Sequence, residues 1–256
     1  MRLLLAQTDI AWHRPADNFS AIEGLLRDAG QPFDVCVLPE MISTGFTMTP
    51  EDCPPDAGDA SVARLRAWSL EYDAAFTGST VYPVAGGFAN RMFFVAAGEV
   101  LAHYDKRHLF RPAGEADVYT AGEGLPEVVT YRGARFLLQV CYDLRFPVAS
   151  SNVGDRYDVA LYVASWPAAR RAHWTALLRA RAIENQAFVA GLNRVGTDGN
   201  DLSYAGDSVV FGPLGEVLAE GPTGQGTLAC TLDLRGLRET RARLPFLRDA
   251  DGFALL

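Results

Sequence analysis

Short apolar runs alternate with helical patterns along almost the whole of this 256-residue chain. The runs typical of buried strands cover residues 2–7, 33–38, 74–81, 91–96, 100–104, 134–140, 158–164, 187–193, 206–211, 216–220 and 227–232. Apolar residues at helical spacing occupy residues 16–29, 60–72 and 168–186. This alternation predicts a layered α/β fold, because apolar strands need other layers against both of their faces.

Turn signals in the last third of the chain favour hairpins between some of these strands. The sequence Gly212-Pro213-Leu214-Gly215 separates two strand-like runs and is typical of a hairpin turn. We therefore expect mixed sheets instead of purely parallel ones. No linker or change of composition divides the chain, so we predict a single domain over residues 1–256.

Composition argues against several classes of partner and location. The formal net charge of −8 disfavours nonspecific nucleic-acid binding, which needs a basic face. No apolar stretch approaches the roughly 18 residues of a membrane span, and the chain becomes polar at Gln7, too early for a signal peptide. The cysteines Cys36, Cys53, Cys141 and Cys230 show no CxxC spacing. We therefore expect free thiols and a cytoplasmic protein.

Three predicted strands end just before a side chain that is capable of chemistry. Glu40, Lys106 and Cys141 each follow a strand-like run within two residues. Ligands of α/β sheets bind beyond the carboxyl ends of the strands, so these side chains converge if the strands point the same way. Lys106 is also the only lysine in a chain that otherwise uses arginine. That choice indicates a site where a guanidinium does not fit.

These three residue types are sufficient to hydrolyse an amide. Cys141 becomes a nucleophile when a base or a positive charge favours its thiolate. Glu40 can accept the thiol proton and pass it to the leaving amine. Lys106 can stabilise the thiolate and the oxyanion, together with the backbone N–H groups that follow Cys141. Taken singly, the three have structural alternatives: a core cysteine, a helix cap and a surface cation.

Other chemistries find less support in the sequence. His13, His103, His108 and His173 lack the spacing of metal ligands, and no GxGxxG, GxxxxGK[ST] or GxSxG motif occurs. His108 can serve a Cys–His pair only if the strand before it continues. We therefore expect neither a metal nor a cofactor.

The strings around the candidate residues resemble the motifs of the nitrilase (carbon–nitrogen hydrolase) superfamily. The matching strings are LPEM (38–41), YDKRHLF (104–110) and CYDLRFP (141–147), and the likeness continues through residues 173–191 and 206–220. Three further segments are similar to the omega-amidase branch, which includes bacterial 2-oxoglutaramate amidases: TGF (44–46), GEADVYTAG (114–122) and ASWPAAR (164–170).

The resemblance implies a four-layer αββα sandwich of two mixed sheets flanked by helices, and a homodimer formed through a helix-lined face. It implies a cofactor-free omega-amidase that hydrolyses short 2-oxo dicarboxylic monoamides through a thioester on Cys141. It also implies that Glu115 holds Lys106 and positions the hydrolytic water, although Glu115 alone reads as a loop carboxylate. An N-carbamoyl or other small-amide hydrolase, and a non-catalytic binding module, remain alternatives.

Four residues are candidates for contact with the substrate: Phe46, Tyr142, Arg145 and Trp166. Arg145 can pair with a substrate carboxylate or, as a structural residue, with Asp143 or a neighbouring acid. Trp166 follows a predicted strand and forms either a wall of the pocket or part of the core. Arg181, Glu184 and Asn185 resemble a family helix, and we expect them to be structural or interface residues.

Overall fold

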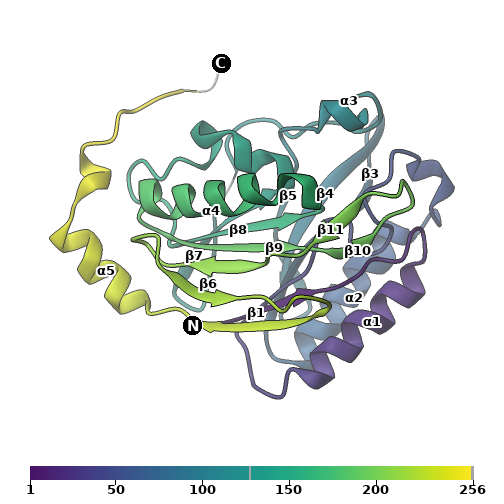
Figure 1. Ribbon diagram of the computed structural model, residues 1–256, viewed down its shortest axis with the longest axis horizontal. Coiled ribbons are helices and arrows are strands. Elements are labelled where there is room, and N and C mark those ends of the chain that lie inside the picture. The colour runs from purple at the N-terminus through teal and green to yellow at the C-terminus, as the bar shows by residue number, and fades with distance from the viewer. Residues whose placement is uncertain (127, 255–256) are drawn as a thin grey trace.

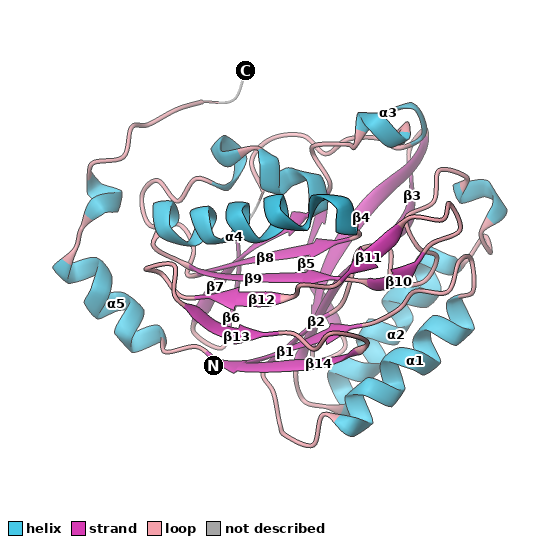
Figure 2. Ribbon diagram, in the orientation of Figure 1, coloured by secondary structure: helices cyan, strands magenta, loops and turns pink. Residues whose placement is uncertain are grey.

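The computed structural model describes residues 1–126 and 128–254. Two six-stranded sheets lie face to face, and helices cover their outer faces (Figures 1 and 2). This arrangement confirms the predicted αββα sandwich of two mixed sheets.

The first sheet carries the N-terminal half of the chain. Its spatial order is β14 (Gly226–Thr231), β1 (Arg2–Gln7), β2 (Val35–Val37), β3 (Ala75–Val84), β4 (Gly87–Ala96) and β5 (Glu99–Asp105). β1, β2 and β3 pair in parallel, whereas β14, β4 and β5 pair with their neighbours in antiparallel fashion. The helices α1 (Pro15–Asp28) and α2 (Ala57–Glu71) cover its outer face. Pro15 occupies the first turn of α1, where its missing N–H costs no hydrogen bond.

The second sheet carries most of the C-terminal half. Its order is β13 (Val217–Glu220), β12 (Val209–Phe211), β9 (Phe188–Asn193), β8 (Val159–Ala164), β7 (Ala134–Val140) and β6 (Val128–Tyr131). β7, β8 and β9 are parallel, and β12 and β13 form the hairpin that the glycine–proline turn predicts. The helix α4 (Arg171–Asn185) covers the outer face and buries Trp174 and Leu178 against the sheet.

The central core forms because strand residues alternate between two apolar layers. In β1, Leu3 and Leu5 belong to the cluster that contains Phe136 of the second sheet. Leu4 belongs to the cluster that includes Trp68 of α2. Successive side chains of a strand point to opposite faces, so one apolar run supplies both layers. This explains why these runs are continuous instead of alternating with polar residues.

Several short or polar elements escape prediction. β6, the hairpin of β10 (Val195–Thr197) and β11 (Ser203–Ala205), α3 (Glu115–Val118) and α5 (Leu234–Arg243) are among them. α5 buries only Leu237, so it carries too few apolar residues for the sequence pattern of a packed helix. The side chain of Asp233 instead caps it by accepting hydrogen bonds from two backbone N–H groups. No helix in the described residues is long and apolar enough to span a membrane.

Candidate active site

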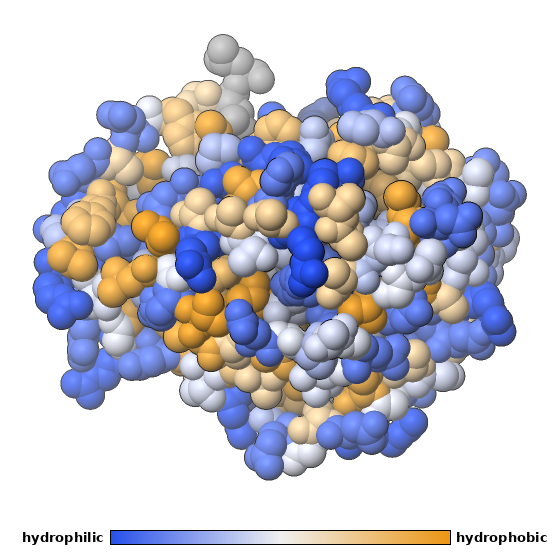
Figure 3. All heavy atoms as spheres, in the orientation of Figure 1, coloured by the Kyte–Doolittle hydropathy of each residue, from blue (hydrophilic) through white to orange (hydrophobic). Residues whose placement is uncertain are grey.

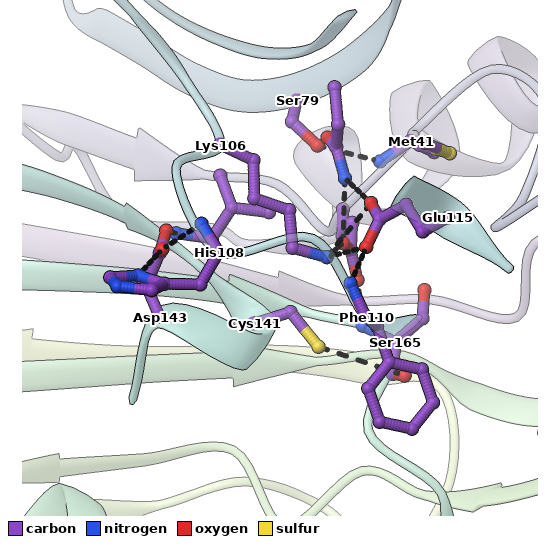
Figure 4. Close-up of polar contacts among 12 residues, drawn as sticks. Met41, Ser79, Lys106, His108, Phe110, Glu115, Cys141, Asp143 and Ser165 are labelled. Atoms are coloured by element: carbon purple, nitrogen blue, oxygen red, sulfur yellow. Dashed lines mark hydrogen bonds and ion pairs between the residues drawn. The ribbon is translucent and has the colours of Figure 1, made fainter. Parts of the chain in front are cut away.

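The candidate residues from three strand ends meet between the two sheets. Glu40 lies beyond β2, Lys106 directly after β5, and Cys141 directly after β7. β5 runs in the same direction as β2, because two antiparallel pairings through β4 separate β5 from β3, the parallel partner of β2. The Nζ atom of Lys106 donates to Oε1 of Glu40 at 2.9 Å. Figure 4 shows the thiol of Cys141 beside this ammonium group.

Glu115 completes an ion-pair cluster that has no exposed surface. It is the first residue of α3, and its two carboxylate oxygens accept from Nζ of Lys106 at 3.0 and 2.8 Å. The backbone N–H of Phe110 donates to the same carboxylate. Glu40, Lys106 and Glu115 are each 0% exposed. Glu115 is therefore an internal partner of the lysine and not a solvated loop carboxylate.

The backbone around Lys106 is held by close contacts on both sides. Its N–H donates to the carbonyl of Asn90 at 2.9 Å, and its carbonyl accepts from the N–H of Gly122 at 3.0 Å. A Cβ atom on residue 122 would lie 2.1 Å from the carbonyl oxygen of Asp105, so only glycine permits this approach. The ammonium group is thus placed by a rigid segment.

Cys141 occupies a strained position at the start of a 3₁₀ turn, Cys141–Arg145. Its φ of 46° lies in the left-handed region, which is unfavourable for a residue with a side chain. Asp143 holds the turn by accepting from the N–H of Val140 at 3.0 Å and from the hydroxyl of Tyr104 at 2.9 Å. His108 also binds Asp143, through Nδ1 at 2.7 Å, so its ring is engaged there and not with the thiol.

Burial and nearby charges together determine whether the thiol of Cys141 and the amine of Lys106 carry a proton. Burial raises the pKa of the Cys141 thiol, the negative charge of Glu40 raises it further, and Lys106 opposes both effects only in part. Burial acts to lower the pKa of Lys106, but Glu115 and Glu40 outweigh it and raise this pKa. The resting pair is therefore a neutral thiol and a charged ammonium group. Lys106 alone does not keep the thiol ionised, so a base is needed to remove its proton, the role predicted for Glu40.

A cavity of about 560 Å³ opens above the cysteine. All four predicted substrate-contact residues line it together with Cys141: Phe46, Tyr142, Arg145 and Trp166. The ring centroid of Phe46 also lies 5.0 Å from Nζ of Lys106. Trp166 is only 3% exposed, and its backbone N–H donates to Asn193 at 2.7 Å, so it is a fixed wall of the cavity.

Arg145 is held by rings and not by a carboxylate. Its guanidinium carbon lies 4.8 Å from the ring centroid of Trp166, and Nη2 lies 3.2 Å from Nδ1 of His173. The oxygens of Asp143 are occupied by other donors, so the structural pairing of Arg145 with Asp143 is wrong. Within residues 1–126 and 128–254, Arg145 forms no ion pair with an acid.

Sequence reasoning misses several residues of the site. The backbone N–H of Ser165 donates to Oε2 of Glu40 at 2.7 Å, and Asn90 donates to both glutamates. Further residues line the cavity: Trp12, Thr47, Met48, Thr49, Phe110, Pro112, Ala113, Pro167, Arg170, Asp198, Asn200, Leu202 and Tyr204. Asn90 and Arg170 carried detectable signals: Asn90 is an amide directly before the apolar run 91–96, and Arg170 ends the ASWPAAR segment that contains Trp166. In the described part of the chain, no group of three His, Cys, Asp or Glu side chains is arranged to hold a metal.

Arg181 and Asn185 of α4 have structural contacts, as predicted. Nη2 of Arg181 donates to the carbonyl of Leu144 at 2.7 Å, which ties α4 to the turn that carries the cysteine. Asn185 accepts from the N–H of Asn152 at 2.8 Å.

Two named relatives match nearly the full length of the chain. It is 47% identical to the omega-amidase YafV of Yersinia enterocolitica, covering all of this chain and 99% of that relative. It is 33% identical to the 2-oxoglutaramate amidase of Bacillus subtilis (strain 168), covering 95% of each.

Solved structures and a family match agree with these relatives. XC1258 of Xanthomonas campestris, a CN-hydrolase superfamily protein with an arsenic adduct in its active site, superposes with a TM-score of 0.92 at 39% identity over 100% of this chain and 99% of that one. An amidase from Nesterenkonia sp. AN1 with acrylamide added to its active-site cysteine gives 0.84 at 28% identity over 96% and 98%. Residues 3–242 match the family described as carbon-nitrogen hydrolase. The chain therefore belongs to the carbon–nitrogen hydrolase family.

Proposed function

We propose that this protein is an omega-amidase that acts, as a single domain of residues 1–256, on short 2-oxo dicarboxylic monoamides and releases ammonia. One observation carries the proposal: a cavity that contains the thiol of Cys141 is also lined by the guanidinium groups of Arg145 and Arg170. The cluster of Glu40 and Lys106 lies next to that thiol and supplies the base and the cation. The names of the full-length relatives support the same activity.

In the acylation step, Glu40 accepts the thiol proton while Sγ of Cys141 attacks the amide carbon. A C–S bond forms, and the carbonyl π electrons move to the oxygen. Lys106 and the backbone N–H of Tyr142 stabilise this oxyanion. The C–N bond then breaks, Glu40 returns the proton to the departing nitrogen, and ammonia leaves behind a thioester. A base is needed because the resting thiol is protonated.

In the deacylation step, water replaces the leaving nitrogen. Glu40 accepts a proton from the water as its oxygen attacks the thioester carbon. The oxyanion forms again at Lys106, the C–S bond breaks, and Glu40 returns the proton to the sulfur of Cys141. The products are the dicarboxylic acid and the resting thiol. Glu115 keeps the ammonium of Lys106 in place through both steps.

The substrate carboxylate is assigned to the guanidinium side of the cavity. The guanidinium carbon of Arg145 lies over the ring of Trp166, 4.8 Å from its centroid, and that of Arg170 lies 5.4 Å from the ring centroid of Phe110. Stacking leaves the in-plane N–H groups of an arginine available for a planar carboxylate. Trp166 then limits the length of the acid that fits between Arg145 and Cys141.

We expect the charges of small amides to determine how fast the enzyme hydrolyses them. The rate of ammonia release measures this, with enzyme that has been treated with EDTA to remove metal ions. 2-Oxoglutaramate and 2-oxosuccinamate should react well and succinamate more slowly. Glutamine and asparagine should react poorly, because their ammonium groups would enter a cavity lined by Arg145 and Arg170.

Arg145→Ala should raise the KM for 2-oxoglutaramate by about 10-fold or more, since a hydrogen-bonded ion pair is lost. The KM for pentanamide should hardly change.

Two outcomes contradict the substrate assignment. Faster turnover of glutamine than of 2-oxoglutaramate would contradict the proposed preference for 2-oxo acids over amino acids. Faster turnover of a carbamoyl amine than of either would place the protein among the N-carbamoyl hydrolases. Loss of activity in EDTA that zinc restores would instead reject the thiol mechanism.

We also propose that the protein is a homodimer joined through α4. Ile183 on α4 and Leu214 in the β12–β13 turn are 50% and 51% exposed, and Gly215 packs against Ile183. Figure 3 shows apolar side chains over the hairpin next to α4, with hydrophilic side chains among them over the helix itself. Light scattering should give twice the chain mass of 27.8 kDa. Ile183→Asp should shift the protein towards the monomer, and a wild-type monomer would contradict the proposal.

We place the enzyme in the cytoplasm. Its four cysteines, Cys36, Cys53, Cys141 and Cys230, are all free and buried. A reducing compartment keeps a nucleophilic thiol such as that of Cys141 active.

A further inference from the structure

Asn90, in the middle of β4, contacts all three charged members of the buried cluster. Its Nδ2 atom lies 2.8 Å from Oε1 of Glu40 and 3.1 Å from Oε1 of Glu115. Its backbone carbonyl accepts from the N–H of Lys106 at 2.9 Å. The residue is 0% exposed. One side chain thus bridges two carboxylates whose like charges repel each other.

The orientation of this amide is determined by its donors. Both N–H groups of Nδ2 point at carboxylate oxygens, while Oδ1 is buried and finds no partner among the described residues. A flipped amide would place its carbonyl oxygen against both carboxylates, which is repulsive. The fold therefore tolerates an unpaired buried acceptor in order to keep the two donors on Glu40 and Glu115.

The hydrogen-bond count at Lys106 explains why such a donor is useful. An ammonium group has three N–H donors, and Nζ of Lys106 already makes three contacts: Oε1 of Glu40, and Oε1 and Oε2 of Glu115. With one N–H directed at each of these oxygens, an oxyanion receives an N–H when one carboxylate oxygen gives up its own or when the two oxygens of Glu115 share one. Asn90 donates to Oε1 of each glutamate, so whichever of these two oxygens is released keeps a donor.

We propose that Asn90 is a positioning residue, which holds Glu40 and Glu115 in place while Lys106 turns one N–H towards the oxyanion. It acts through these residues and does not touch the substrate. The proposal rests on the roles given above to Glu40 and Lys106 in the proposed function. A neutral donor suits this position, because a cation would compete with Lys106 and an acid would add a third negative charge.

The test compares Asn90→Leu, which has similar volume and no donor, with Asn152→Leu as a matched control. Asn152 is also buried, but it bonds to Tyr157 and Asn185, away from the cluster. Asn90→Leu should lower kcat by about 10- to 100-fold with little change in KM. The acid limb of kcat/KM should move up by about one pH unit, since carboxylates that lose a donor protonate more easily. Asn152→Leu should lower the Tm and leave the pH profile unchanged.

Alkylation of Cys141 by iodoacetamide as a function of pH supplies a second readout that needs no amide substrate. Its acid limb should move in the same direction in Asn90→Leu. If 2-oxoglutaramate is not turned over by the wild type, the substrate assignment fails while this readout still tests Asn90. Asn90→Ser, which keeps one donor, should recover part of kcat, and Asn90→Asp, of the same shape, should be as impaired as Asn90→Leu.

Three results would overturn the proposal. The first is a folded Asn90→Leu variant with wild-type kcat. The second is a loss of kcat with an unchanged acid limb in both assays, because that pattern matches a purely structural role. The third applies if Asn90→Leu does not fold: it is an Asn90→Asp variant whose kcat and pH profile equal those of the wild type.

Discussion

The Cys141→Ala variant should fold normally and lose ammonia release by about 10⁴-fold or more, because no other side chain can form the thioester. The thiol lies 4.0 Å from the carbonyl oxygen of Ser165 and lines the cavity, so its removal leaves the surrounding cluster intact. Steady-state assays and circular dichroism measure the two halves of this expectation. Turnover above a few per cent of wild type with an unchanged spectrum would reject Cys141 as the nucleophile.

Cys36→Ala is the matched control for this variant. Cys36 lies within β2, is fully buried and does not line the cavity. Its replacement should reduce stability through lost packing and retain activity per folded molecule. Cys53, whose pKa is raised to about 11 by burial and two nearby acids, provides a reference thiol for labelling. A Cys141 that is no more reactive than Cys53 would favour a non-catalytic binding module.

Alkylation also separates base catalysis from a preformed thiolate. The negative charge of Glu40 raises the pKa of the Cys141 thiol, so Glu40→Gln should increase labelling if a resting thiolate were the reactive species. If Glu40 acts as the base that removes the proton during attack, the same substitution should slow labelling by iodoacetamide. We expect the slower rate, because burial keeps the resting thiol protonated.

Lys106→Arg preserves the charge, but it should lower kcat by at least about 10²-fold. A loss of this size is usual when one oxyanion donor is removed. The ammonium group is 0% exposed and lies within 3.0 Å of both Glu40 and Glu115. A planar guanidinium is larger and directs its donors in one plane, so it cannot reach both acids and the oxyanion together. Rates measured at saturating substrate separate this loss from a change in KM.

The same variant also tests whether the only lysine is an accident of composition. Near-normal kcat in Lys106→Arg would contradict the role assigned to the ammonium group. The surface substitution Arg235→Lys offers a matched reverse exchange, since Arg235 is exposed and its guanidinium pairs with Glu239 on the same helix, α5. It should leave kcat and Tm close to wild type.

Local patterns in the sequence identified the layers and the three strand-end residues. The continuous apolar runs of β1, β7 and β8 are visible from near neighbours along the chain, and such runs are typical of strands buried on both faces. Polar α5 and the short β10–β11 hairpin escape prediction, because they contain few apolar residues and depend on a cap and on tertiary contacts. Glu115 required a family resemblance, since its own surroundings in the sequence look like those of a solvated loop.

What the sequence by itself determined is the fold class and the positions of Glu40, Lys106 and Cys141, because periodicity and chain order encode where strands end. Only the tertiary structure decided the donors around them and the protonation of the thiol. Asn90 reaches Glu40 across 50 residues of sequence, and the N–H of Ser165 reaches it across 125. Such contacts, and the burial that raises the pKa of Cys141, exist only when the two sheets are packed together.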